Sequence, residues 1–197
     1  MDLDGVRPAA VEFAGRTDSA IARDLLRHAG VPDVRINKRA AEVAAAAGSA
    51  YEQLCPPDLS AFVAPGVPEV LAALAAQPEA YRLALVTGNF EPVARRKLAS
   101  AGIGHYFAGG QGGFGSDAED RGKLPAVART RAGGWPRERT VVIGDTPRDI
   151  ACARADRVRV VAVATGPYSA EALADADAVV DGARAVPPVL ADFATWA

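Results

Sequence analysis

The sequence has little of what marks a disulfide-rich, zinc-binding or membrane protein. Its 197 residues include only two cysteines, Cys55 and Cys152, which are too few and too far apart for a disulfide framework or a zinc site. No apolar run approaches the ~18 residues of a membrane span. The N-terminus lacks the charged-then-apolar pattern of a signal peptide. We therefore expect a cytoplasmic protein.

An excess of charge of one sign is also absent. The 22 Lys and Arg residues nearly balance the 24 Asp and Glu residues, so the net charge of −2 offers no basic footprint for nucleic acid. The two histidines, His28 and His105, are isolated and receive no role. We expect neither nucleic acid nor membrane as a partner. The composition leaves the oligomeric state open.

The first third of the chain reads as helical, without a strand between its helices. One apolar face runs from Ser19 to Gly30, with a capping residue at 17–19, and a second helix is expected from about Asn37 to Leu54. We assign residues 1–62 to a small helical cap, which looks incomplete, and residues 63–197 to a core domain.

From Pro65 onward, strand and helix patterns alternate. One helix is expected to begin at Pro68, and others are expected in PVARRKLASAGI, LPAVARTRA, PRDIACARA and SAEALADA. The expected strands are RLALV, TVVIG, VRVVAVA and AVV. Continuously apolar strands that alternate with helices predict an α/β fold, a doubly wound parallel sheet covered on both faces. In such sheets the functional residues follow the carboxyl ends of the strands.

Two strand ends carry suitable chemistry. Thr87, Gly88 and Asn89 follow LALV, where a hydroxyl and close backbone amides can cradle a phosphate group. Asp145 and Asp149 follow TVVIG, and this spacing can aim two carboxylates at one Mg²⁺ ion. The alternative for this pair is helix capping and compensation of the helix dipole.

In combination, VTGN, then a basic residue in EDRGK, then VVIGDTPRDI resembles the haloacid dehalogenase (HAD) superfamily of phosphohydrolases. The likeness covers about residues 65–181, where FGSDAEDR resembles a segment of the phosphoglycolate-phosphatase-like members. GRTD, at residues 15–18, further resembles the helical cap of those members. The likeness implies attack on phosphorus by an aspartate, an aspartyl-phosphate intermediate, and a second aspartate that acts as general acid and base.

The resemblance also implies roles for particular residues. Asp145 and Asp149 would bind or position Mg²⁺, with Asp145 in direct contact. Thr87 would hydrogen-bond the phosphoryl oxygens, helped by the amides of Gly88 and Asn89. Arg16, in the GRTD segment, would contact the substrate.

The basic residue of the third motif is either Arg121 or Lys123. Lysine is the usual residue in the superfamily, whereas Arg121 better fits the phase of the helix that follows. We favour Arg121, and the residue left over would be an exposed charge.

The opening MDLDGV looks like the nucleophile motif, with Asp2 and Asp4 in the two catalytic positions. Such a nucleophile must follow a central strand, but only Met1 precedes Asp2, and residues 3–14 leave no room for the loop and helix expected before Gly15. Because a strand, loop and helix need roughly 30 residues, we interpret MDLDGV as a look-alike and the first strand as missing. In a minority interpretation, Asp2 and Asp4 act within an unusual strand order.

The missing strand would lie between the strands that end at Val86 and Gly144. We expect a gap there, direct pairing of the two strands, or filling by N-terminal residues; direct pairing would be the least strained.

The sequence thus favours a Mg²⁺-dependent phosphatase of a small phosphorylated metabolite, weakly active or inactive as this 197-residue chain. The alternative is a non-catalytic protein that binds a phosphorylated ligand or a protein partner. Dehalogenase chemistry is less favoured, because two metal-aimed acids indicate phosphate.

Overall fold

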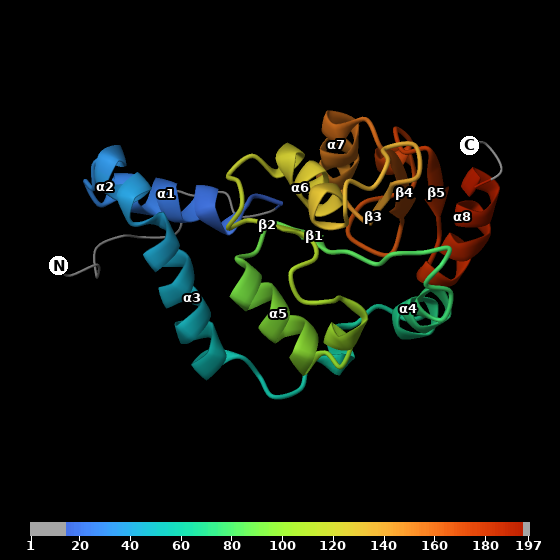
Figure 1. The fold of residues 1–197 in the computed structure, drawn as a ribbon, viewed down its shortest axis with the longest axis horizontal. Helices are drawn as coiled ribbons and strands as arrows, with labels where there is room; N and C mark the ends of the chain where they lie inside the picture. The colour runs from blue at the N-terminus through green and yellow to red at the C-terminus, as the bar shows by residue number, and fades with distance from the viewer. Residues whose placement is uncertain (1–14, 195–197) are drawn as a thin grey trace.

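The computed structural model describes residues 15–194, and it places three helices at one end of the molecule and an α/β unit at the other (Figure 1). The MDLDGV segment, with Asp2 and Asp4, lies outside the described residues. Within residues 15–194 no helix is long and apolar enough to cross a membrane.

The N-terminal helices are α1 (Asp18–His28), α2 (Asp33–Lys38) and α3 (Ala40–Leu54). Thr17 caps α1, because its Oγ1 accepts a hydrogen bond from Ala20 N at 3.2 Å. The helix expected from about Asn37 to Leu54 is confirmed as α3, although it begins three residues later, at Ala40. Arg39, with φ −114° and ψ 14°, leaves the helical conformation and separates α2 from α3. The division at residue 62 stays a prediction.

The α/β unit contains the remaining elements. Its helices are α4 (Val67–Ala75), α5 (Glu91–Ser100), α6 (Leu124–Arg131), α7 (Pro147–Asp156) and α8 (Val186–Ala194). Its strands are β1 (Val86–Thr87), β2 (Gly113–Phe114), β3 (Val141–Gly144), β4 (Arg159–Val163) and β5 (Ala178–Val180). Short 3₁₀ turns include η4 (Arg121–Lys123) and η5 (Glu171–Leu173). SAEALADA, expected to be a helix, forms only η5.

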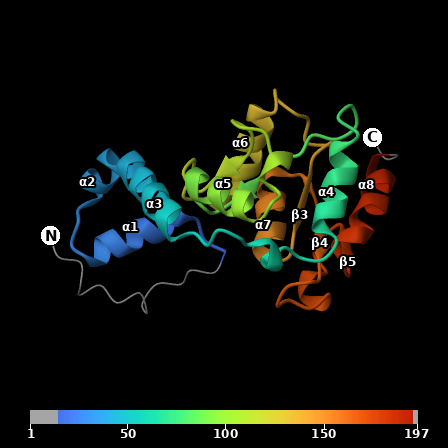
Figure 2. The same ribbon diagram turned by 90° about the horizontal axis from the view of Figure 1, so that it is seen from below.

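All the described strand pairs are parallel, which confirms the predicted α/β class. They form a three-stranded sheet in the order β3-β4-β5 and a two-stranded sheet of β1 and β2. The three-stranded sheet lies between α7 on one face and α4 and α8 on the other (Figure 2). Side chains of β4 alternate between these layers: Val160 and Ala162 pack in the cluster with α7, and Val161 and Val163 pack in the cluster with α4 and α8.

The apolar run at 82–87 forms less strand than its sequence predicts. Only Val86 and Thr87 are strand residues, although Leu85 O also accepts a hydrogen bond from Gly113 N at 2.8 Å. Its partner β2 was missed, because two glycines beside one phenylalanine give no strand pattern. Phe114 is nonetheless fully buried, with the guanidinium carbons of Arg95 and Arg131 at 5.1 and 6.0 Å from its ring centroid.

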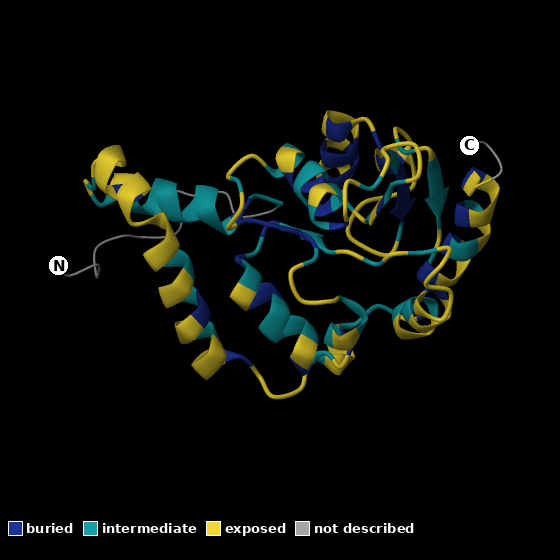
Figure 3. Cartoon of the chain, in the orientation of Figure 1, coloured by how far each residue is buried: buried dark blue, intermediate teal, exposed yellow. Residues whose placement is uncertain are grey.

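A gap, not direct pairing, separates the two sheets among the described residues. No ladder joins β1 to β3 within residues 15–194. Ile143, in the third position of β3, is 46% exposed, and Ala84, before β1, is exposed as well. Figure 3 shows parts of the chain leading to β1 in the colour of exposed residues. Apolar side chains normally buried in a central strand therefore remain accessible. Filling of the slot by N-terminal residues concerns a segment outside the described part of the chain.

A buried ion cluster secures the far end of α7. Asp156 is only 5% exposed, and its carboxylate accepts two hydrogen bonds from Arg129, at 2.7 and 2.8 Å, and one from Arg137 at 3.2 Å. Burial alone would raise the pKa of Asp156, but the hydrogen bonds and charges of the two arginines outweigh burial and lower that pKa. The cluster ties α6 and the loop before β3 to α7.

We predict that Asp156→Asn destabilises the fold by about 3 kcal/mol, because two guanidinium groups lose their buried partner. A carboxyl group with a lowered folded-state pKa stabilises the protein above its unfolded pKa of about 3.9, and this contribution disappears as the pH falls through the folded value. Urea unfolding across pH 2–7 should therefore show less loss of stability on acidification in the variant. Parallel curves for the two proteins would contradict this role for Asp156.

The divided sheet predicts uneven amide exchange. The β4 amides should exchange far more slowly than those of residues 83–85. In the described part of the chain, β4 has a strand on each side and residues 83–85 do not. Hydrogen exchange read by NMR would check this. Strong, uniform protection of residues 83–86 and 141–143, with a cooperative melt of ordinary height, would show that the gap is closed in solution.

Candidate active site

The turn from β3 into α7 places two carboxylates at the end of the sheet. Thr146 is the N-cap of α7, and it forms a capping box with Asp149. Asp149 N donates to Thr146 Oγ1 at 3.2 Å, and Asp149 Oδ2 accepts from Thr146 N at 3.1 Å and Thr146 Oγ1 at 2.8 Å. Asp149 therefore caps α7, as the alternative interpretation of the sequence expected, and this is one part of its role.

The other oxygen of Asp149 binds Arg121. Arg121 Nη2 lies 2.6 Å from Asp149 Oδ1, and both side chains are largely buried. This pair joins η4 to the first turn of α7 and fixes the direction of the guanidinium group. Arg121 Nε is buried and has no hydrogen-bond partner among the described residues. Lys123, its rival from the sequence, is exposed at the end of the same turn.

Asp145 is the more accessible of the two carboxylates. It is exposed beside the loop after β4, where a Cβ atom added to Gly166 would lie 2.7 Å from Asp145 Oδ2. Glycine at position 166 thus leaves room for this carboxylate. Gly144 does the same for Asp149, since a Cβ atom there would lie 2.6 Å from Asp149 Oδ2.

The carboxylates of Asp145 and Asp149 are candidate ligands of a Mg²⁺ ion. No cluster of three or more His, Cys, Asp and Glu side chains suited to a metal ion occurs between residues 15 and 194. Mg²⁺ is commonly held by one or two carboxylates, with water and substrate phosphate as its other ligands. Asp145 fits such a site, whereas the oxygens of Asp149 already accept three hydrogen bonds. Direct coordination by Asp149 stays a prediction.

The loop after β1 has the predicted hydroxyl, but its groups are partly engaged. Thr87 Oγ1 accepts a hydrogen bond from Asn89 N at 3.2 Å, which leaves the hydroxyl proton for another acceptor. The Asn89 side chain donates to Asp18 and accepts from Lys97 Nζ at 3.1 Å. The Thr87 hydroxyl thus keeps a proton to donate, whereas the Asn89 side chain is engaged with Asp18 and Lys97. Phosphoryl binding by Thr87 stays a prediction.

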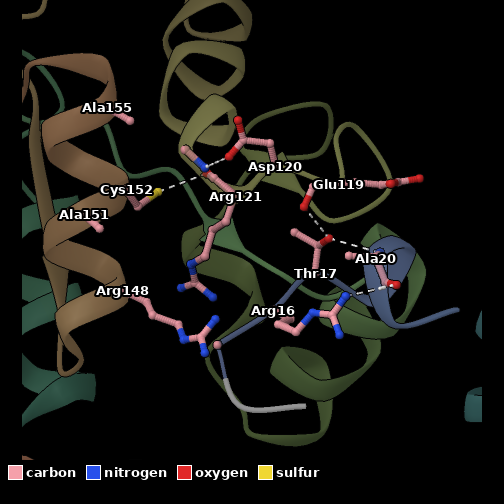
Figure 4. Close-up of a pocket in the computed structure, with 12 residues that line it drawn as sticks. Arg16, Thr17, Ala20, Glu119, Asp120, Arg121, Arg148, Ala151, Cys152 and Ala155 are labelled. Carbon is pink, nitrogen blue, oxygen red and sulfur yellow. Dashed lines mark hydrogen bonds between the residues drawn. The ribbon is translucent and has the colours of Figure 1, made fainter. Parts of the chain in front are cut away.

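A pocket of about 360 Å³ lies between the start of α1, η4 and α7 (Figure 4). Arg121 and Arg148 reach into it from the core, and Arg16 and Thr17 lie across it. Arg16 Nη2 also binds Asp24 Oδ2 at 2.7 Å. The pocket brings Arg16 and Arg121, predicted from separate motifs, to one surface. Thr87 and Asp145 do not line it.

The pocket also contains a cysteine, whose thiol contacts η4. Cys152 Sγ donates to the carbonyl oxygen of Arg121 at 3.1 Å. Burial is the largest cause that raises the pKa of Cys152, to about 11. The thiol is therefore protonated at neutral pH and helps to hold η4 against α7.

Comparison with protein families identifies the family to which the chain belongs. Residues 4–154 match the haloacid dehalogenase-like hydrolase family, and residues 121–192 match the HAD-hydrolase-like family. The first match covers more than half of the chain, so the protein belongs to the haloacid dehalogenase-like hydrolases, and the predicted superfamily is confirmed. No curated protein matches the sequence in a search. The phosphoglycolate-phosphatase-like subtype stays a prediction.

Sequence reasoning missed three side chains near the site. Asp18 and Lys97 hold Asn89, and Arg148 lines the pocket. Arg148 stands between two predicted site residues in DTPRD, so its position was a usable signal. Nothing local to Asp18 or Lys97 indicates their shared partner.

Matched variants can test whether Arg121 or Lys123 is the basic residue of the third motif. We predict that Arg121→Gln weakens binding of inorganic phosphate by about tenfold, the equivalent of one charge-assisted hydrogen bond. Lys123→Gln should bind phosphate like the unmodified chain, because its side chain is exposed. Titration calorimetry in the presence of Mg²⁺ measures both. Equal losses, or a larger loss in Lys123→Gln, would reassign the third motif to Lys123.

Proposed function

We propose that the protein is a Mg²⁺-dependent phosphatase of a small phosphorylated metabolite. The family match supports a hydrolase in general. The observation that carries the phosphatase proposal is the 2.6 Å ion pair between Arg121 and Asp149, beside Asp145 at the end of β3. It holds a permanent positive charge at the edge of the sheet where a phosphate dianion would bind.

In this proposal each described residue acts on the phosphoryl group or on a neighbour that does. Thr87 donates its hydroxyl proton to a phosphoryl oxygen, and Arg121 offsets the charge of nucleophile and phosphate. Asp145 holds Mg²⁺, which when bound neutralises charge that develops on the transferring group. Asp149 keeps Arg121 and the start of α7 in place.

The chemical step would follow the family's route. An aspartate oxygen attacks phosphorus, the phosphorus–oxygen ester bond breaks, and the leaving alkoxide takes a proton from a general acid. Water then cleaves the aspartyl-phosphate and releases inorganic phosphate. Asp2 and Asp4, the candidates of the opening motif, lie outside the described residues, so the nucleophile is not assigned from the structure.

One observation favours the second candidate, a protein that binds phosphate without turnover. Of the two carboxylates that follow β3, Asp149 is committed to Arg121 and Thr146, which leaves Asp145 to serve the metal. An aspartyl-phosphate mechanism needs a nucleophilic carboxylate in addition.

The two candidates differ in Mg²⁺-dependent release of phosphate from a panel of small phosphorylated metabolites that includes 2-phosphoglycolate. We predict that Asp145→Asn lowers this release by at least about 100-fold, because the metal loses its protein carboxylate. Asp175→Asn is the matched control, since Asp175 is exposed and precedes β5 at the opposite edge of the sheet.

Undiminished release by Asp145→Asn would remove this acid from the mechanism. Phosphate binding by the unmodified chain, without release from any compound, would support the binding protein instead.

A further inference from the structure

The N-terminus of α1 lies directly on the loop that follows β1. The carboxylate of Asp18 accepts a hydrogen bond from Phe90 N at 2.8 Å and from Asn89 Nδ2 at 3.2 and 3.3 Å. The backbone N–H of Asp18 donates to Gly88 O at 2.7 Å. Asp18 alone thus binds three consecutive loop residues, Gly88, Asn89 and Phe90. Asn89 and Phe90 lie 71 and 72 positions further along the chain.

Close backbone packing leaves this loop little freedom. A Cβ atom on Gly88 would collide with Arg16 O, and one on Gly115 would collide with Gly88 O. Gly115 N donates to Asn89 O at 2.8 Å, and Ser19 Oγ donates to Gly115 O. Three chain segments therefore meet backbone to backbone, at two positions where only a residue without a side chain fits.

The hydrogen bonds around Asn89 form a chain that ends at Thr87. Asp18 holds the amide nitrogen of the Asn89 side chain, and Lys97 holds its carbonyl oxygen. With Asn89 fixed in this way, its backbone N–H points at Thr87 Oγ1. The direction in which Thr87 can donate its own proton follows from these contacts.

We propose that Asp18 is a positioning residue for phosphoryl binding, which acts through Asn89 on Thr87. This inference rests on the proposed function of Thr87. Asp18 itself does not need to touch the substrate. Its competing role is purely structural: a carboxylate in the first turn of α1 also stabilises that helix through the helix dipole.

An exchange of the two side chains separates these roles. In Asp18→Asn, the new amide can accept from Phe90 N, but its nitrogen then faces the Asn89 amide nitrogen, and both are donors. Rotation of the Asn89 amide only moves the conflict to Lys97, which is also a donor. In the double variant Asp18→Asn/Asn89→Asp, every donor regains an acceptor and the summed charge of the pair is unchanged.

The experiment measures inorganic phosphate affinity in the presence of Mg²⁺, and amide exchange at Phe90, in the unmodified chain and both variants. We expect Asp18→Asn to weaken phosphate binding about tenfold and to speed Phe90 exchange by a similar factor. The double variant should recover both to within about threefold. Asp33→Asn is the control. Asp33 is a carboxylate of α2 whose described hydrogen bonds go to Arg23 and Arg27, away from the loop.

The outcomes are distinct. If both single changes, Asp18→Asn and Asp33→Asn, leave phosphate affinity and Phe90 exchange unchanged, the inference is overturned. Suppose that Asp18→Asn loses phosphate affinity and Phe90 protection, and that the double variant restores neither of them. Asp18 then serves helix stability, and the inference fails as well. If the unmodified chain binds no phosphate, the proposed function fails, while recovery of Phe90 protection in the double variant still supports the hold of Asp18 on the loop.

Discussion

The carboxylate of Asp149 holds together the part of the molecule on which the candidate site depends. One oxygen closes the capping box that starts α7, and the other fixes Arg121 at 2.6 Å. Because α7 covers one face of the β3-β4-β5 sheet, the same group links core packing to the placement of a cation at the sheet edge. Asp145 directly precedes the capping residue Thr146, so its position also depends on this start of α7. The buried carboxylate of Asp149 is satisfied by three hydrogen bonds, whereas Arg121 Nε is buried without a partner among the described residues.

The division of the sheet has a simple physical origin. A strand is stable where its backbone groups are paired on both sides or face water. Among residues 15–194, the run at 82–87 pairs on one side only, through β2. Its apolar side chains favour burial, yet Ala84 and Ile143 remain exposed on either side of the gap. Short strands and exposed apolar groups are thus two effects of one missing set of hydrogen bonds.

Local signals account for what the sequence could predict. TVVIGD followed by PRDIACARA gave β3 and α7, because the apolar run, the capping threonine and the proline in the first turn all act within a few residues. The partner of Asp149 could not be read in this way, since Arg121 lies 28 positions earlier in the chain. The same holds for Asp18 and Asn89, which are 71 positions apart. Pairings of this kind depend on how the helices and strands pack, and a residue pattern predicts the elements without their contacts.

The N-terminal helices and the loop after β1 are not independent of each other. Lys97 contacts both the loop and α3. Its Nζ lies 3.1 Å from Asn89 Oδ1 and 5.4 Å from the ring centroid of Tyr51 on α3. Nearby, α3 packs so closely on α5 that a Cβ atom on Gly48 would lie 2.7 Å from the Pro92 side chain. A shift of α1 would move Asp18, one of the two groups that hold the Asn89 side chain. A ligand that shifts α1 would therefore act on the loop that carries Thr87 through Asp18.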